Sequence, residues 1–486
     1  MSDTPDPDVS PQEEHHGPGS RLEASSRPAR AETGLASRGL DRVGLILAWL
    51  IIGIGVVLWS IKPGGGEGVD PVAQVPDGLL IDAQTEMSGR ISLGMSSLFP
   101  FISARSQLAP LSQGSPADQI CLAIFDGATS SPEEGAASLQ GIVDAHPDDP
   151  IVELLAPPVF SAFEAVSDGG LPSEETSGLL EERLGWYGGL AAAMGDPDRL
   201  QVIERDCAGF AMTLVTFLLG FGIAGFLGFV GLVVIIFLGC GNPSLIRVPT
   251  PARHVVYAET FAGWLLLMLL LQFVMSLVAP AGLGVLMSIL AFFGSLLALG
   301  WPVLRGIPWS TVRADIGLRT VRFSDVPTGV ASWAMALPLM GIGLAITLVL
   351  MLLQTVLAGE AASPGHPAQE AAVGAGTVQL VQLFILACVA APIVEEIMFR
   401  GVFLTHLCGW SRKWPLLLGL TFAMAVSSIV FAAIHPQGPI FIPPLAGLAV
   451  GFCISRLWRG SLWPAIVAHG VNNAAVLTLN VMLFSS

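Results

Sequence analysis

Two carboxylates and an arginine stand close together in an otherwise apolar stretch of this chain, at Glu395, Glu396 and Arg400. Residues four apart share one face of a helix, so Glu396 and Arg400 can form an ion pair. Glu395 is turned about 100° from Glu396 and need not share the arginine. Ionisable groups inside long apolar segments are costly and usually functional. The pattern predicts one carboxylate held in an ion pair and another that acts as a general base.

Two histidines and an amide follow in later apolar stretches. His435 ends the run that contains Phe431, and His469 lies four residues before Asn473, on the same helical face. With Glu395, these side chains suit the activation of a water and the stabilisation of an oxyanion, as peptide hydrolysis requires.

Each pattern also has a purely structural explanation. An ion pair can lock a helix bundle, a histidine before proline is often an interfacial residue, and a His/Asn face can form hydrogen bonds between helices. The occurrence of all three patterns in this order favours one shared site.

The three patterns, Glu-Glu-x-x-x-Arg, Phe-x-x-x-His and His-x-x-x-Asn, resemble the motifs of the CPBP family of CAAX proteases and abortive-infection proteins. The flanking Phe399-Arg400-Gly401, Ser461-Leu462-Trp463 and Asp315–Leu318 segments are similar too, and the resemblance covers roughly residues 310–484. It implies a membrane-embedded endopeptidase that cuts a membrane-associated or membrane-presented protein or peptide.

The resemblance also implies a role for each residue. Glu395 and His435 would activate the attacking water, and His469 and Asn473 would stabilise the oxyanion. The Glu396–Arg400 pair would position the helix and Glu395.

Metal dependence stays open. Glu395, His435 and His469 are suitable zinc ligands by type, as in a metalloprotease, but the chain lacks His-Glu-x-x-His. A metal-free glutamate mechanism fits the same residues.

The elements that position these residues must lie in a membrane. The chain has 486 residues, of which 52% are hydrophobic and 12% are charged, with a mean hydropathy of +0.69. Soluble proteins carry about 25% charged residues. The prediction is therefore an all-α, polytopic membrane bundle with about nine transmembrane helices. Expected spans after the first are 209–239, 257–279, 282–304, 328–358, 377–408, 415–435, 440–456 and 461–484.

Composition divides the chain into five parts. Residues 1–42 read as a disordered tail, 43–61 as an anchor helix, and 62–207 as a small, mostly helical soluble domain inserted after that anchor. Residues 208–306 read as accessory transmembrane helices and 307–486 as the protease core.

The acidity is concentrated in one part. Residues 62–206 carry 23 acidic and 6 basic side chains, whereas the whole chain has a net charge of −16. No basic run favours nucleic acid. We expect the 62–207 domain to bind a protein partner or to have a structural role.

The arginines predict the orientation. Loops expected on one side carry Arg247, Arg253, Arg305 and Arg412, and the short loops on the other side carry no Lys or Arg. The positive-inside rule then places the N-terminus in the cytoplasm and the acidic domain outside. Composition favours a prokaryotic inner membrane.

The same residues are compatible with two other functions. A catalytically idle family member would serve as a membrane scaffold or partner-binding protein. A transporter would use the buried residues as a proton relay, but the sequence shows no inverted repeat.

The depths of two site residues conflict in this scheme. Glu395 falls mid-span or toward the cytoplasmic end, whereas His435 falls near the outer end of its span. A shared site requires a broken or re-entrant chain between 400 and 445.

Overall fold

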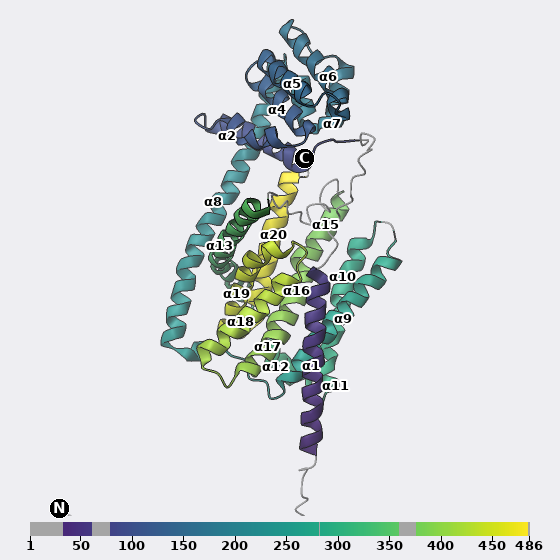
Figure 1. Ribbon diagram of the computed structural model, residues 1–486. Coiled ribbons are helices and arrows are strands. Elements are labelled where there is room, and N and C mark those ends of the chain that lie inside the picture. Colours follow the sequence, from purple (N-terminus) through teal and green to yellow (C-terminus); the bar gives the residue numbers. More distant parts are fainter. Residues whose placement is uncertain (1–32, 61–77, 281, 359–375, 485–486) are drawn as a thin grey trace, which may run out of the picture.

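The computed structural model describes residues 33–60, 78–280, 282–358 and 376–484. Within these ranges the regular structure is entirely helical, which confirms the predicted fold class. Figure 1 shows a bundle of long helices with a group of shorter helices at one end.

The N-terminal helix α1 (Thr33–Ser60) lies along α9 (His254–Val278). It begins ten residues before the predicted anchor, 43–61. Most of the predicted tail, residues 1–32, lies outside the described ranges.

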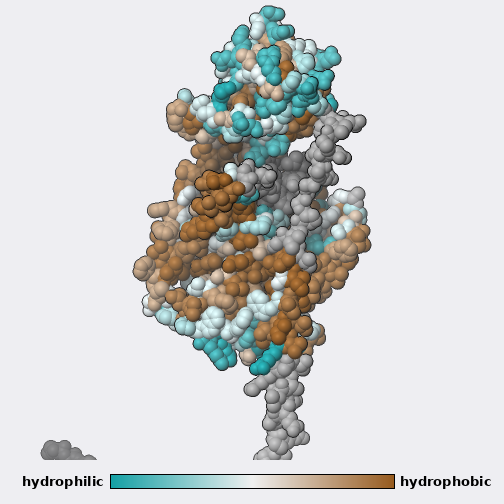
Figure 2. Space-filling view, in the orientation of Figure 1, coloured by the Kyte–Doolittle hydropathy of each residue, from teal (hydrophilic) through white to brown (hydrophobic). Residues whose placement is uncertain are grey.

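The short helices α2 to α7 form a unit with its own apolar core, here called the helical unit (Figure 1). Asp82, Ser115 and Asp149 cap its helices through backbone N–H groups. Its helices are α2 (Ala83–Leu98), α3 (Ala104–Gln107), η1 (Ala109–Gln113), α4 (Pro116–Thr129), α5 (Pro132–Ala145), α6 (Pro150–Ser167) and α7 (Glu174–Ala193). Its surface is mainly hydrophilic, in contrast to the brown bundle beneath it (Figure 2).

Helix α8 (Pro197–Gly241) connects the helical unit to the bundle. It spans 45 residues, packs against α2 near its start and contacts α13 further along. The expected boundary at residue 207 thus falls inside one continuous helix, so the helical unit is joined to the bundle by a rigid element.

Nine helical segments in the described ranges are long and apolar enough to cross a bilayer. One of them, Pro150–Ser167, is α6 of the helical unit. The other eight belong to the bundle and, with α1, agree with about nine crossings. The bundle elements after α8 are η2 (Pro243–Leu245), α9, α10 (Gly284–Ser295), η3 (Leu296–Leu299), α11 (Gly300–Leu304), α12 (Trp309–Ile316), α13 (Asp325–Ala358), the continuous helix α15–α17 (Thr377–Ser411), α18 (Leu416–Ala433), η6 (Pro439–Phe441), α19 (Ile442–Arg459) and α20 (Trp463–Phe484).

Glycines set the close packing of α19 on α13. Gly447 and Gly451 lie one turn apart on α19, and a Cβ on either would clash with Leu339 or Ala336 of α13. Small residues four apart allow membrane helices to approach closely where no hydrophobic effect drives them together. This contact holds α19 beside the functional helices.

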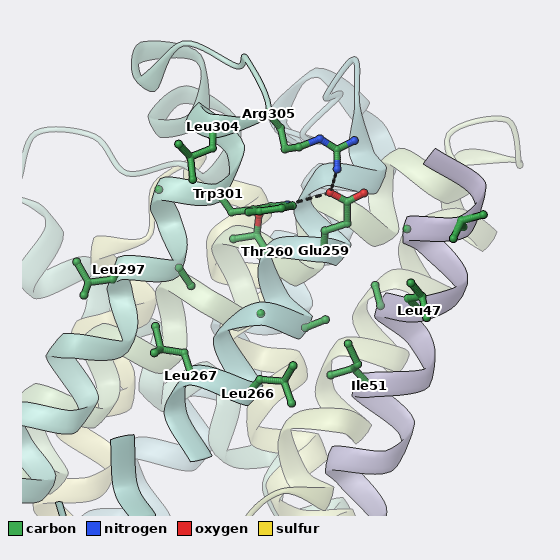
Figure 3. Close-up of a pocket in the computed structure, with 17 residues that line it drawn as sticks. Leu47, Ile51, Glu259, Thr260, Leu266, Leu267, Leu297, Trp301, Leu304 and Arg305 are labelled. Atoms are coloured by element: carbon green, nitrogen blue, oxygen red, sulfur yellow. Dashed lines mark hydrogen bonds and ion pairs between the residues drawn. The ribbon is translucent and has the colours of Figure 1, made fainter. Parts of the chain in front are cut away.

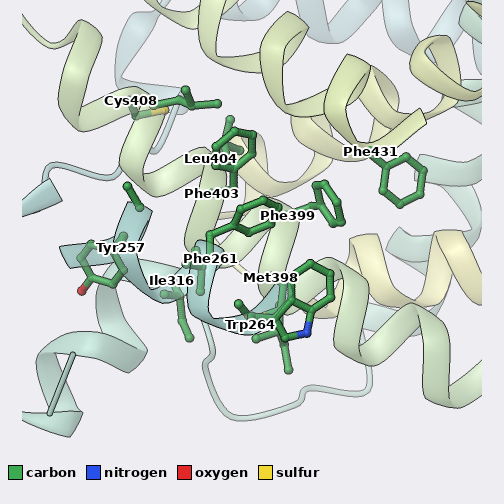
Figure 4. Close-up of a cluster of buried hydrophobic side chains, with 14 of the residues drawn as sticks. Tyr257, Phe261, Trp264, Ile316, Met398, Phe399, Phe403, Leu404, Cys408 and Phe431 are labelled. Atoms are coloured by element: carbon green, nitrogen blue, oxygen red, sulfur yellow. The ribbon is translucent and has the colours of Figure 1, made fainter. Parts of the chain in front are cut away.

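An aromatic cluster joins α9 to the middle of the α15–α17 helix (Figure 4). The rings of Phe261 and Phe403 stack with centroids 4.4 Å apart, and Phe261 meets Phe399 edge-on at 5.1 Å. The expected accessory segment 208–306 therefore shares a hydrophobic core with the expected protease core.

Candidate active site

The predicted site begins on an irregular part of the α15–α17 helix. It consists of α15 (Thr377–Ile385), the π-helical η4 (Leu386–Ala390), α16 (Ala391–Glu396), the π-helical η5 (Ile397–Phe403) and α17 (Leu404–Ser411). The pair Glu395 and Glu396 thus lies between two π-helical segments. Such segments are rare and occur often at functional sites, because they redirect side chains and release backbone carbonyls.

Glu396 and Arg400 form the ion pair that their spacing predicts. Arg400 Nη1 lies 2.7 Å from Glu396 Oε1, and both side chains are fully buried. The guanidinium also lies 4.3 Å from the ring centroid of Phe431 and 5.3 Å from that of Phe452. The arginine is thus held by a carboxylate and by two aromatic faces from α18 and α19.

His469 connects the two carboxylates. Its Nδ1 lies 2.9 Å from Glu396 Oε1, and its Nε2 lies 3.8 Å from Glu395 Oε2. The ring is stacked on Phe452 with centroids 5.4 Å apart. A carboxylate only accepts hydrogen bonds, so Nδ1 carries a proton and Nε2 faces Glu395.

His435 approaches the same carboxylate from another helix end. Its Nδ1 donates to the carbonyl oxygen of Phe431 at 2.6 Å, and its Nε2 lies 3.8 Å from Glu395 Oε2. Two Nε2 atoms therefore face one carboxylate oxygen. Distances of 3.8 Å exceed a direct hydrogen bond of about 3 Å and suit groups bridged by one water.

The hairpin of α17 and α18 brings His435 to the depth of Glu395. The 16 steps from Glu395 to Ser411 rise about 24 Å, and the 17 steps of α18 return by about 26 Å. Beyond α18, the chain turns through Gly438 (φ 86°) and η6 into α19. The chain is thus broken where the sequence required it, and the expected difference in depth does not arise.

Asn473 lies on the same face of α20 as His469 but bonds to the backbone. Its Nδ2 donates to the carbonyl oxygen of Ala387 in η4 at 2.8 Å. The amide carries two N–H groups, so this bond leaves one for another acceptor. Its neighbour Asn472 is buried and has an Oδ1 atom without a hydrogen-bond partner among the described residues.

A cavity of about 230 Å³ opens beside Glu395 and His435. Its opposite wall comes from α9, through Trp264, Met268 and Gln272. Sequence reasoning did not assign α9 to the site. The sequence feature that could have indicated α9 is Gln272, the single amide side chain in the apolar stretch 257–279, since polar groups inside such spans are often functional.

Three side chains of the site could in principle be zinc ligands. Glu395, His435 and His469 are suitable ligands by type. In the described part of the chain, however, no group of three or more His, Cys, Asp or Glu side chains is arranged to hold a metal ion. Among the described residues, these donors therefore do not fit a zinc ion.

Residues 377–475 match a family model described as type II CAAX prenyl endopeptidase Rce1-like. The matched segment contains all six predicted site residues and confirms the resemblance to CAAX proteases there. No curated protein and no solved structure matches the chain.

Proposed function

We propose that this chain is an intramembrane endopeptidase that hydrolyses a peptide bond in a membrane-associated or membrane-presented protein. The observation that carries the proposal is the convergence of His435 and His469 on Glu395, with a cavity lined by Glu395 and His435 beside them. The match to a family of membrane proteases supports the reaction class.

Glu395 is the proposed general base. A water between Glu395 Oε2 and His435 Nε2 gives one proton to the carboxylate while its oxygen attacks the carbonyl carbon of the substrate. When the C–N bond breaks, the proton passes from Glu395 to the leaving nitrogen. The products are a carboxylic acid and an amine, and the carboxylate is regenerated.

His469 and Asn473 are the proposed oxyanion donors. His469 can donate from Nε2 only when both of its ring nitrogens carry protons, and Glu396 holds the Nδ1 proton. Arg400 bonds the same carboxylate and fixes its position. Donors that are held in place before the reaction stabilise the developing charge without reorganisation.

The position of the site fits a membrane substrate. His469 lies six residues after the start of α20 at Trp463, which is about 9 Å along the helix. Trp463 bonds the carbonyl of Arg319, next to the expected cytoplasmic loops. We infer that the site lies within the membrane-spanning part of the bundle.

The same arrangement supports the proposed orientation. Helix α8 ends, and α11 lies, at the end of the bundle opposite the helical unit (Figure 1). Arg253 directly precedes α9, Arg305 directly follows α11, and Arg459 ends α19. By the positive-inside rule, this end is cytoplasmic and the helical unit lies outside. We also propose that the membrane is a prokaryotic inner membrane and that the helical unit binds a protein partner.

The test uses purified full-length protein in liposomes with a panel of fluorogenic peptides, lipid-modified and unmodified. We expect wild-type protein to cleave at least one peptide. The cleavage rate of Glu395→Gln should be about 10²–10⁴-fold lower. Glu153→Gln, the same change on an exposed face of α6, serves as control. Cleavage in ¹⁸O-labelled water should place the label in the new carboxyl group.

Two outcomes would contradict the proposal. Equal cleavage by wild type and Glu395→Gln rejects Glu395 as the base. No cleavage of any peptide, with the fold intact, favours the alternative of a catalytically idle scaffold that binds partners.

A further inference from the structure

A second and larger cavity lies between α1, α9 and α11. It has a volume of about 750 Å³, within the ~300–1,000 Å³ typical of ligand sites. Its walls are mainly apolar, with Leu47 and Ile51 on α1 facing Leu266 and Leu267 on α9 (Figure 3). We call it the α1–α9 groove.

One end of the groove carries a buried carboxylate. Only 9% of the Glu259 side chain is exposed. Its Oε2 accepts from Trp301 Nε1 at 2.9 Å and pairs with Arg305, as the dashed lines in Figure 3 show. Its Oε1 points toward Gly44 of α1 and has no hydrogen-bond partner in the described part of the chain. An unpaired carboxylate oxygen at this depth is costly, so a donor from a ligand would stabilise it.

The charges around this end balance one another. Arg305 also bonds Asp41 Oδ1 at 3.1 Å, and Arg253 lies 3.7 Å from the same oxygen. Two arginines and two carboxylates thus surround the mouth of an apolar groove. Such a set complements a ligand that carries one positive and one negative charge on an apolar body.

We propose that the α1–α9 groove binds a phospholipid whose zwitterionic headgroup ends in a primary ammonium, of the phosphatidylethanolamine class. The ammonium donates to Glu259 and stacks near Trp301, and the phosphate lies toward Arg253 and Arg305. The acyl chains lie along the apolar walls. The outward-facing Leu297 and Leu304, which are 78% and 80% exposed, open the groove to the bilayer.

Position in the membrane supports a lipid as the occupant. Asp41 precedes the apolar part of α1, Arg253 immediately precedes α9, and Arg305 immediately follows α11. Charged residues at helix ends lie at headgroup level, and the groove runs from them into the apolar zone. This site is separate from Glu395 and does not depend on the proposed peptidase activity.

The test measures retained lipid by native mass spectrometry. Full-length protein in mild detergent is titrated with palmitoyl-oleoyl phosphatidylethanolamine, phosphatidylcholine or phosphatidylglycerol. We expect wild-type protein to prefer the ethanolamine lipid about tenfold or more, because a charged hydrogen bond is lost with the other two. Glu259→Gln should abolish the preference.

A groove-filling variant tests the location. An added Cβ on Gly263 meets no atom within 4 Å, so Gly263→Leu should fill the groove without a clash and remove the bound lipid. Gly222→Leu, the same change at an equally open glycine of α8, should retain it. Equal retention of the three lipids, a preference for the glycerol lipid, or unchanged binding by Glu259→Gln or Gly263→Leu would each overturn the proposal.

Discussion

Replacement of Arg400 by methionine should strongly destabilise the bundle. The change keeps an apolar stem and removes the guanidinium, which leaves Glu396 as a fully buried carboxylate with His469 as its remaining partner. The loss of one partner of a buried ion pair costs about 3–5 kcal/mol. For the predicted core of about 180 residues, 2–4 °C per kcal/mol gives a fall in melting temperature of about 6–20 °C.

A double variant isolates the cause. Arg400→Met with Glu396→Gln removes both charges, so no charge stays buried and unpaired. We expect this variant to regain most of the lost melting temperature, because well-packed neutral side chains often replace a buried ion pair at little cost. Both variants are compared with wild type by the thermal shift of tryptophan fluorescence in detergent.

Two outcomes would contradict the predicted role of the Glu396–Arg400 ion pair. An Arg400→Met protein that melts within about 2 °C of wild type would show that the pair carries less than about 1 kcal/mol. A double variant that is no more stable than Arg400→Met would show that the cation–π contacts with Phe431 and Phe452 matter more than the ion pair.

Three further predictions follow from the structure. His435→Ala should lower the cleavage rate about 10²–10⁴-fold with little change in melting temperature, because the Nδ1 hydrogen bond of His435 is made to Phe431 within its own segment; a large loss of stability would indicate a structural role instead. Gly451→Leu should separate α19 from α13 and destabilise the bundle by several kcal/mol, whereas Gly222→Leu should not, as thermal melts will show. In the helical unit, burial raises the pKa of the Cys121 thiol above its ordinary value of 9.0. The unfolded chain therefore loses this proton at a lower pH than the folded chain, and the stability of the unit should fall as pH rises above about 9. Hydrogen exchange of α4 should show a smaller pH dependence of stability in Cys121→Ala.

Helix α9 forms part of the wall of both cavities in the bundle. Its Trp264, Met268 and Gln272 line the cavity beside Glu395, and Glu259 on the same helix lies at the end of the α1–α9 groove. Helix α9, which lies outside the matched segment, thus contributes to both cavities. Variants of Gln272 should therefore affect substrate choice more than the chemical step.

The sequence by itself determined the class of the protein and predicted the charged and polar residues of its candidate site, although not the wall from α9. Apolar runs far longer than a soluble core can absorb require membrane helices, because backbone groups in lipid must be satisfied within a helix. Charges inside apolar spans are so costly that Glu395, Glu396 and Arg400 could be singled out from the sequence, although Glu259 in the expected span 257–279 was not. Their i, i+4 spacing also predicted the ion pair that forms.

Only the tertiary structure decided which helices meet around these residues. The pairing of His435 with Glu395 depends on the length of α18 and the turn after it, which hydropathy does not define. The wall from α9 depends on ring packing between Phe261 and Phe403, residues that are 142 positions apart in the chain. Apolar helix faces are alike in composition, so shape complementarity, and not residue type, selects their neighbours.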